Sequence, residues 1–297
     1  MMFSTQSYAA MAARVAQLAR VALGEVETRV FADGERYLRL RSDPRGTDAT
    51  VLGGTVSDAD TLELYDLACG VVEAGARSLT LVIPYFGYST MERATRKGEI
   101  VTAKTRARLL SSVPVPGSGS RVLLLDLHTE GIPFYFEGAL RPHHVSAAPA
   151  VLPFLRQLGG DVVACTDAGR AKWVERFANL MGIQAAFVFK RRQEEGMEVT
   201  AVSAQVAGKR VVIYDDMVRT GGSLIAAARA YKDAGAASIS AVATHGVLPG
   251  DAAQRIRDSG LFEKLAITDS HPRALAVRSD FIEVIPVAPV LAAALTA

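Results

Sequence analysis

The sequence has few cysteines and no long apolar run. Cys69 and Cys165 are the two cysteines among 297 residues, and their spacing matches neither a metal site nor a redox pair. This excludes a disulfide-stabilised scaffold and indicates a reducing compartment, so we expect a cytoplasmic protein. No apolar run approaches the ~18 residues that a transmembrane helix needs, and we therefore expect no membrane association.

The chain also has almost no net charge. Its 33 basic and 31 acidic side chains leave a balance of +2, which supplies no overall field to attract nucleic acid. Any anionic ligand must be bound by local geometry. Apolar residues make up 49% and charged residues 22%, values that exclude disorder and allow a large core. The length fits two compact units or one large one.

The first residues resemble a transit peptide only weakly. Arg14 and Arg20 are present and no acid precedes Glu25, but the segment AAMAARVAQLARVAL fits the opening helix of a fold equally well. The motif FADGE follows shortly after it. We therefore interpret this segment as part of the folded protein.

Short apolar runs alternate with helical patterns over the whole length. This alternation is typical of an α/β fold with mainly parallel strands. The segments AGARSLTLVIPYF and AGAASISAVATH occupy similar places in the two halves, which suggests duplication of one α/β unit. Strands are predicted at residues 28–32, 50–55, 79–86, 121–128, 161–167, 185–191, 210–216, 238–245 and 264–270.

Two domains are predicted, with a boundary near three prolines. Pro142, Pro149 and Pro153 are expected to break regular structure there. The last residues predict a short strand and then a terminal helix that must dock to bury its apolar face. The predicted domains are residues 1–145, with residues 284–297 packed on them, and residues 146–283.

The segment VVIYDDMVRTGGSL, residues 211–224, carries two adjacent acids and a glycine loop. The acid pair, Asp215 and Asp216, ends a buried strand, where open α/β sheets place ligands. The loop after it precedes a helix, whose N-terminus favours an anion, and carboxylates accept hydrogen bonds from hydroxyls. A sugar phosphate fits, and simple helix capping by Ser223 is the alternative. The TGGS loop comprises Thr220, Gly221, Gly222 and Ser223.

Two further polar residues follow predicted strands. Asp167 stands in DVVACTDAGR and His128 in LLLDLH. Alone, Asp167 fits an ordinary turn and His128 a simple hydrogen-bonding group. Because both share the strand-end position of the acid pair, a metal or phosphate role is the alternative.

Two segments are rich in basic residues. KRRQEEG, residues 190–196, has no apolar residue before Met197, so it fits either a solvated hairpin or a flap that brings cations onto transferring phosphates. The basic segment after PYFGY includes Arg93 and fits either a solubility feature or a site for a nucleotide's phosphates.

The joint order of these motifs resembles the ribose-phosphate pyrophosphokinase family. FADGE, PYFGY with ER, TAK, LLLDLH, TDAG, KRR, DDMVRTGGSL and ATH follow one another over nearly the whole chain. The resemblance implies an α/β fold of two phosphoribosyltransferase-like domains related by duplication, each a mainly parallel sheet flanked by helices. It also implies transfer of a diphosphoryl group from MgATP to O1 of ribose 5-phosphate, with release of AMP.

For the acceptor, the resemblance implies that Asp215 and Asp216 hold the ribose and the TGGS loop the 5-phosphate, with Arg219 beside them. Lys190 and Arg192 would be the catalytic cations on a flexible loop. His128 and Asp167 would serve Mg²⁺ and the ATP phosphates. These roles come from matching motif positions.

For ATP, the resemblance implies a site reached across a subunit interface, so we expect a homo-oligomer, a dimer or a hexamer. The partners would be ATP and ribose 5-phosphate. The residues implied to contact ATP are Phe31, Asp33, Gly34, Glu35, Arg93 and His128.

The chain departs from the family pattern at several positions. Thr90 and Met91 replace an Arg-Gln pair, which leaves nucleotide preference open. Arg219 replaces an acid, and TDAGR stands for the usual PDxGG. The segment STMER to LLS and the run GIPFYF are nearer the plant-type second class. A catalytically silent regulatory homologue and a phosphoribosyltransferase that consumes the sugar diphosphate are the alternative functions.

Overall fold

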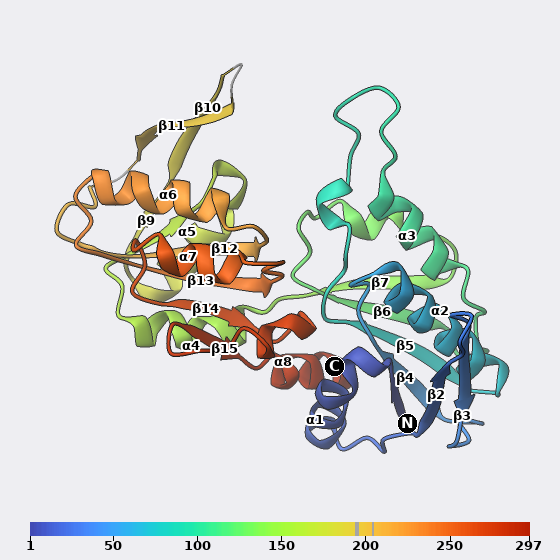
Figure 1. Ribbon diagram of the computed structural model, residues 1–297. Helices are drawn as coiled ribbons and strands as arrows, with labels where there is room; N and C mark the ends of the chain where they lie inside the picture. Colours follow the sequence, from blue (N-terminus) through green and yellow to red (C-terminus); the bar gives the residue numbers. More distant parts are fainter. Residues whose placement is uncertain (194–195, 204) are drawn as a thin grey trace. The chain divides into compact units, whose positions relative to one another are not determined.

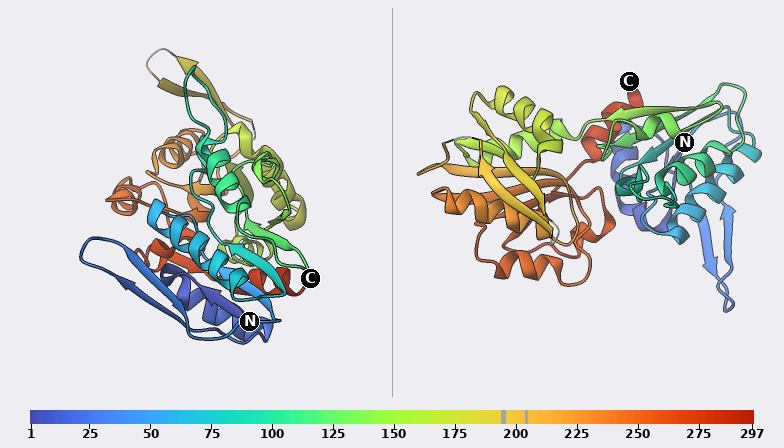
Figure 2. Two further views of the ribbon diagram at one scale, coloured as in Figure 1. Left: turned by 90° about the vertical axis from the view of Figure 1, so that its right-hand side faces the viewer. Right: turned by 90° about the horizontal axis from the view of Figure 1, so that it is seen from above.

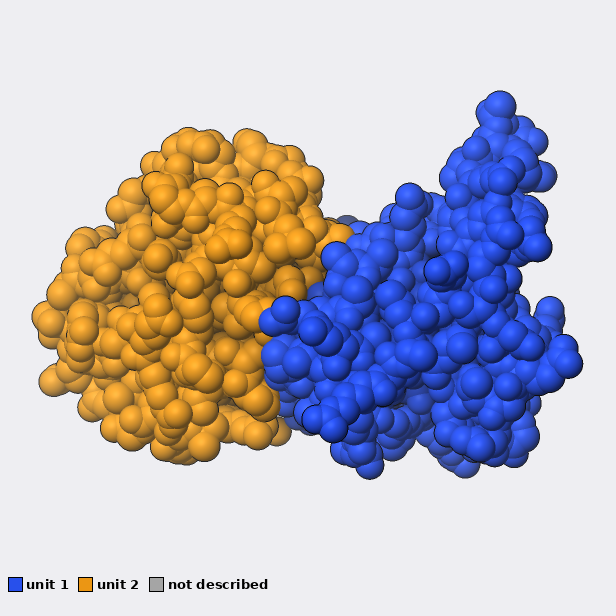
Figure 3. Space-filling model, turned by 90° about the horizontal axis from the view of Figure 1, so that it is seen from below, with its two compact units in different colours: residues 1–146, 288–297 blue, residues 147–287 orange. Residues whose placement is uncertain are grey.

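The computed structural model describes residues 1–193, 196–203 and 205–297 (Figure 1). Of residues 168, 189–193 and 196–201 it describes the backbone only. The chain forms two compact units, which Figure 3 distinguishes by colour. Unit 1 consists of residues 1–146 and 288–297, and unit 2 of residues 147–287. The predicted α/β class with parallel sheets is confirmed in both.

Unit 1 is built on a five-stranded, all-parallel sheet in the order β1-β4-β5-β6-β7. Leu81 and Ile83 of β5 share a core with α2 and α3, whereas α8 contacts β6 and β7 and packs on α1. Near-continuous burial of β5 follows from this cover. The strands are β1 (Met2–Ser4), β4 (Asp48–Leu52), β5 (Ser78–Ile83), β6 (Ser120–Leu125) and β7 (Leu140–Val145). The helices are α1 (Ala9–Ala19), α2 (Asp58–Glu73), α3 (Thr102–Ser111) and α8 (Ala288–Thr296).

A two-stranded antiparallel hairpin, β2 (Val26–Val30) and β3 (Arg36–Leu40), projects from the body of unit 1 (Figure 2). Arg36, the first residue of β3 after the turn, forms an ion pair at 2.5 Å with Glu63 of α2, which is buried and also accepts a hydrogen bond from the Gln6 amide at 2.8 Å. The tip of the hairpin, residues 31–35, is exposed.

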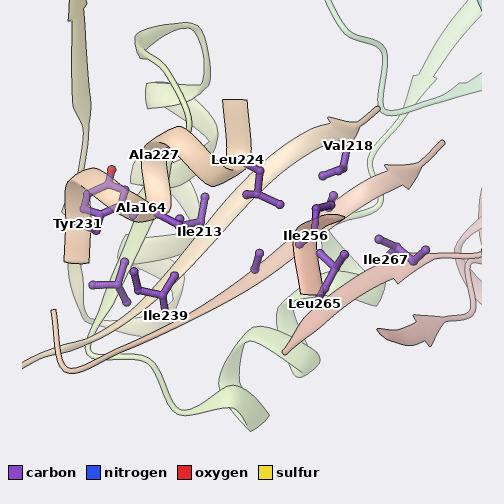
Figure 4. Close-up of a cluster of buried hydrophobic side chains, with 14 of the residues drawn as sticks. Ala164, Ile213, Val218, Leu224, Ala227, Tyr231, Ile239, Ile256, Leu265 and Ile267 are labelled. Carbon is purple, nitrogen blue, oxygen red and sulfur yellow. The ribbon is translucent and has the colours of Figure 1, made fainter. Parts of the chain in front are cut away.

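Unit 2 is built on a six-stranded, all-parallel sheet in the order β15-β14-β13-β12-β8-β9. Figure 4 shows the apolar cluster between this sheet and the helices, including Ile213 of β12 and Leu224 of α6. The strands are β8 (Val162–Cys165), β9 (Gln184–Ala186), β12 (Arg210–Val218), β13 (Ser238–Gly246), β14 (Leu265–Thr268) and β15 (Ile282–Ile285). The helices are α4 (Ala148–Leu158), α5 (Ala171–Met181), α6 (Gly222–Asp233) and α7 (Ala252–Asp258).

The prediction of one strand over residues 185–191 is wrong. The chain forms β9 at the edge of the sheet and then β10 (Val188–Gln193), which pairs antiparallel with β11 (Gly196–Val202). Phe187 lies between the two strands, its amide donating to Ser203 Oγ at 2.8 Å and its carbonyl accepting from the Ser203 amide at 2.9 Å. This pair of bonds turns the chain out of the sheet and into the hairpin.

The three prolines do not all break regular structure. Pro142 lies within β7 and Pro153 within α4, while Pro149 stands in the first turn of α4. A proline is tolerated in β7 because this strand is at the edge of its sheet, and in a helix's first turn because its missing N–H has no intrahelical partner.

Both ends of the chain lie in unit 1. The apolar side of α8 is buried against α1, and Arg121 donates to the Leu295 carbonyl at 2.8 Å. The segment with Arg14 forms part of α1. In the described part of the chain, no helix combines the length and the apolar character that crossing a membrane requires.

Replacing Leu64 by alanine will lower the free energy of unfolding by about 2–5 kcal/mol, because this side chain is fully buried between α2 and the sheet. Leu62 lies on the same helix and is 51% exposed, so Leu62→Ala is the matched control, with an expected change within about 0.5 kcal/mol. Denaturant titration followed by circular dichroism measures both. Equal losses would contradict the packing of α2.

Candidate active site

The acid pair lies on β12, a strand with a neighbour on each side. Tyr214 is in register with Cys165, the last residue of β8, so β12 continues past β8 where the acids begin. Asp215 and Asp216 are both buried, and the strand extends to Val218 rather than ending at the acids. The acid pair therefore lies beyond the end of β8, at the carboxyl edge of the sheet, where β13 still pairs with β12.

The Asp215 carboxylate is fixed from two directions. Thr166 Oγ1 donates to Asp215 Oδ2 at 2.8 Å, and the Asp216 amide donates to Asp215 Oδ1 at 2.9 Å. Burial raises the pKa of the Asp215 carboxyl well above its ordinary value, and the neighbouring Asp216 carboxylate raises it further. Two buried acids side by side therefore require a compensating positive charge.

Arg170 supplies that charge. Its Nη2 lies 2.9 Å from Asp216 Oδ1 and its Nε 3.8 Å from Asp215 Oδ1, and its side chain is only 10% exposed. It ends the short 3-10 helix of residues Ala168–Arg170, which follows β8. Neither Arg170 nor Thr166 is predicted as a site residue from sequence. The one sequence feature that could have indicated them is the segment TDAGR, which directly follows β8, the strand next to β12.

The TGGS loop forms the entry to α6. Gly221 is the N-cap residue, in the left-handed region at φ 81°, and no side chain caps this helix. Capping by Ser223 is therefore wrong, because Ser223 already stands inside α6. Residues 220, 222 and 223 are exposed, and the free amides at such a helix start favour an anion.

The loop is anchored to the core on both sides. Val218 precedes it, Leu224 follows it, and both belong to the cluster of Figure 4 together with Ile256 of α7. A Cβ at Gly221 would lie 2.6 Å from Ile256 Cγ1, so only glycine fits there. Arg219 is exposed on the same loop.

The other predicted residues of unit 2 lie near this edge or on the hairpin. Asp167 follows β8, is partly exposed, and accepts from the Gly169 amide at 2.9 Å. Lys190 and Arg192 lie on β10, opposite Val199 and Met197 of β11. The side chains of both cations are outside the described part of the structure, as are residues 194 and 195 of KRRQEEG, so their catalytic role stays a prediction.

The predicted ATP residues lie in unit 1, in two places. Phe31, Asp33, Gly34 and Glu35 form the exposed tip of the β2–β3 hairpin. There Asp33 Oδ1 accepts from the Glu35 amide at 3.1 Å, and Phe31 packs edge-on against Tyr37.

The second place is at the carboxyl edge of the unit 1 sheet. His128 is partly exposed just past β6, and Arg93 is 77% exposed beside Glu92. His128 and Asp167 stand in different units. Among the described residues, no group of three or more His, Cys, Asp or Glu side chains is arranged to hold a metal ion.

Gly221→Ala will lower the free energy of unfolding by about 1–3 kcal/mol, because the new Cβ meets Ile256 in a left-handed backbone. Gly222→Ala is the matched control: its Cβ meets nothing closer than Thr220 Oγ1 at 3.8 Å, so its stability should hold. Thermal and denaturant unfolding measure the stability of both variants. A neutral Gly221→Ala would show that the loop tolerates another conformation.

Comparisons with known proteins agree with this architecture. A family model described as the N-terminal domain of ribose phosphate pyrophosphokinase matches residues 1–113. A second, described as a phosphoribosyl synthetase-associated domain, matches residues 167–297. The two matches fall largely in unit 1 and unit 2, respectively.

Individual relatives cover nearly the whole chain. The ribose-phosphate pyrophosphokinase of Prochlorococcus marinus is 33% identical over 300 residues, covering 99% of this chain and 89% of that protein. That of Streptomyces coelicolor is 32% identical, with coverage of 99% and 91%. The crystal structure of phosphoribosylpyrophosphate synthetase from Mycobacterium smegmatis superposes with a TM-score of 0.87 at 28% identity, covering 99% of this chain and 97% of that one. The chain therefore belongs to the ribose-phosphate pyrophosphokinase family of enzymes.

Proposed function

We propose that this protein transfers the β,γ-diphosphoryl group of ATP to O1 of ribose 5-phosphate, giving 5-phosphoribosyl 1-diphosphate and AMP. The observation that carries the proposal is the juxtaposition of the acid pair with the uncapped N-terminus of α6. The acid pair would accept hydrogen bonds from the hydroxyls of a sugar phosphate, and the N-terminus of α6 would bind its phosphate. Membership of the family supports the same reaction.

The acceptor would lie along the loop between β12 and α6. Its 5-phosphate would accept hydrogen bonds from the TGGS loop amides and hydroxyls, and its 2- and 3-hydroxyls would donate to Asp215 and Asp216. Arg219, exposed on the same loop, would add positive charge near the phosphate. This orientation directs O1 away from the loop and leaves it open to attack the donor.

The donor would be bound by unit 1 residues. The hairpin tip with Phe31, Asp33, Gly34 and Glu35 would contact adenosine, and its exposure supports contact with the ATP site of a second copy in a homo-oligomer. Arg93 and His128 would contact the phosphates. Thr90 and Met91, in the short helix Ser89–Met91, stand next to this region and would tune nucleotide preference.

The proposed metal-binding side chains, Asp167 and His128, would suit Mg²⁺. This ion prefers oxygen ligands and is usually bound by one or two carboxylates together with the phosphates of its nucleotide. Asp167 offers such a carboxylate, partly exposed at a strand end, and His128 would assist on the side of the ATP phosphates. When bound, Mg²⁺ would neutralise phosphate charge.

The chemical step would be an in-line displacement at the β-phosphorus. O1 of the sugar forms a bond to this phosphorus, the bond from it to the α,β-bridging oxygen breaks, AMP leaves with that oxygen, and the O1 proton is released. Lys190 and Arg192 would stabilise the charge that develops on the β-phosphoryl group and on AMP. Positioning and charge neutralisation provide most of the rate.

Purified protein supplied with MgATP and ribose 5-phosphate should form AMP and diphosphorylated sugar in equal amounts. Separation of nucleotides by anion exchange, with phosphorus NMR of the sugar, measures both products. Omission of the sugar is the control, and AMP should then be absent. Formation of ADP, or no AMP at all, would contradict the proposal; the latter would favour a catalytically silent homologue.

Lys190→Ala should lower kcat by about 10²–10³-fold or more, because the cation proposed to stabilise the developing charge is lost. Ribose 5-phosphate affinity should survive, since the acid pair and the TGGS loop are untouched. Lys209→Ala is the control: Lys209 precedes β12 at the opposite edge of the sheet, and its activity should match the unmodified protein. An unchanged rate in Lys190→Ala would remove the hairpin from the mechanism.

A further inference from the structure

The contact between Arg170 and the acid pair uses the same oxygens that a sugar would need. Asp216 Oδ1 is 2.9 Å from Arg170 Nη2, and Asp215 Oδ1 is 3.8 Å from its Nε. Asp215 Oδ2 already accepts from Thr166. The guanidinium therefore lies against Oδ1 of both carboxylates.

This ion pair is shielded from water. The side chains of Arg170, Asp215 and Asp216 are 10%, 12% and 8% exposed. A charge-assisted bond in such a place is about twice as strong as a neutral one, and removing one partner leaves the other poorly compensated. Arg170 therefore stabilises the acid pair when no ligand is bound.

A guanidinium and a vicinal diol present similar faces to a carboxylate, because each offers two neighbouring donors. Asp216 Oδ1 accepts from the guanidinium, and both Asp215 oxygens accept hydrogen bonds, from Thr166 Oγ1 and from the Asp216 amide. A diol that approaches the acid pair from the side of Arg170 therefore has to displace the guanidinium from Asp216 Oδ1.

We propose that Arg170 competes with the vicinal hydroxyls of the sugar for Asp215 and Asp216 and thereby sets the affinity of the site for its acceptor. The proposal rests on the acceptor site of the proposed function. Sugar binding replaces the ion pair of Arg170 with hydrogen bonds from two neutral hydroxyls to the carboxylates. Arg170 is a specificity-determining residue, since an anion that lacks a diol binds the TGGS loop without displacing it.

Two probes separate these contributions, ribose 5-phosphate and inorganic phosphate, each titrated by calorimetry in the absence of ATP. Arg170→Ala should bind ribose 5-phosphate about ten- to a hundredfold more tightly, the equivalent of one charge-assisted hydrogen bond. Its affinity for inorganic phosphate should be unchanged. Arg176→Ala, an exposed arginine of the following helix α5, is the matched control and should alter neither affinity.

Kinetics provide a second readout. With MgATP, the KM for ribose 5-phosphate should fall in Arg170→Ala while kcat changes little, a split that a merely structural role would not produce. Arg170→Lys keeps the charge but loses the planar guanidinium. Its affinity for ribose 5-phosphate should therefore lie between those of the unmodified protein and Arg170→Ala.

Because Arg170→Ala can fail to fold, the unmodified protein is also tested. Its arginine Nε–H signals are followed by NMR, with that of Arg170 assigned from Arg170→Lys or Arg170→Gln. Ribose 5-phosphate should shift the Arg170 signal and inorganic phosphate should not. A signal that stays in place with the sugar bound overturns the proposal, as does equal or weaker sugar binding by a folded Arg170→Ala. If the unmodified protein and all variants fail to bind ribose 5-phosphate, the acceptor site itself is wrong.

Discussion

Two adjacent carboxylates buried on one strand are the constraint around which unit 2 is arranged. Ionised acids at this depth are unfavourable unless each has a partner, and their mutual repulsion adds to the penalty. Thr166 from the loop after β8, the backbone of β12 itself and Arg170 provide these partners. The loop between β8 and α5 therefore has to lie directly over the carboxyl edge of β12, and the order of the strands ensures this, because β8 and β12 are neighbours.

The same strand positions the proposed anion site. β12 continues past its acids to Val218, and the loop then turns through Gly221 into α6. Apolar residues on both sides of the turn pack into one core, so the amides of the first turn of α6 are held at a fixed place relative to the carboxylates. A site that must bind hydroxyls and a phosphate of one molecule needs that fixed separation, which two mobile loops could not supply.

Much of this arrangement follows from the sequence. Apolar runs that alternate with helical patterns predict parallel sheets, and an acid pair directly behind a β-branched run predicts a ligand site at a strand end. The motif order predicts the family. The turn at Phe187 and the inclusion of Pro142 in an edge strand could not be predicted, because they depend on which strands become neighbours and which remain at an edge.

The role of Arg170 was equally invisible, since a contact across 45 residues of sequence depends on the pairing of β8 with β12. Gly221 rather than Ser223 caps α6 for a different reason: backbone dihedral angles decide where a helix begins, and a Thr-Gly-Gly-Ser run permits more than one start.

In the proposed function, the acid pair and the TGGS loop together form the acceptor site. A crystal structure of the protein with ribose 5-phosphate would test this arrangement. We expect the 5-phosphate at residues 220–223, the 2- and 3-hydroxyls on Asp215 and Asp216, and the guanidinium of Arg170 withdrawn from both acids. A sugar bound elsewhere, with the ion pairs of Arg170 intact, would contradict it.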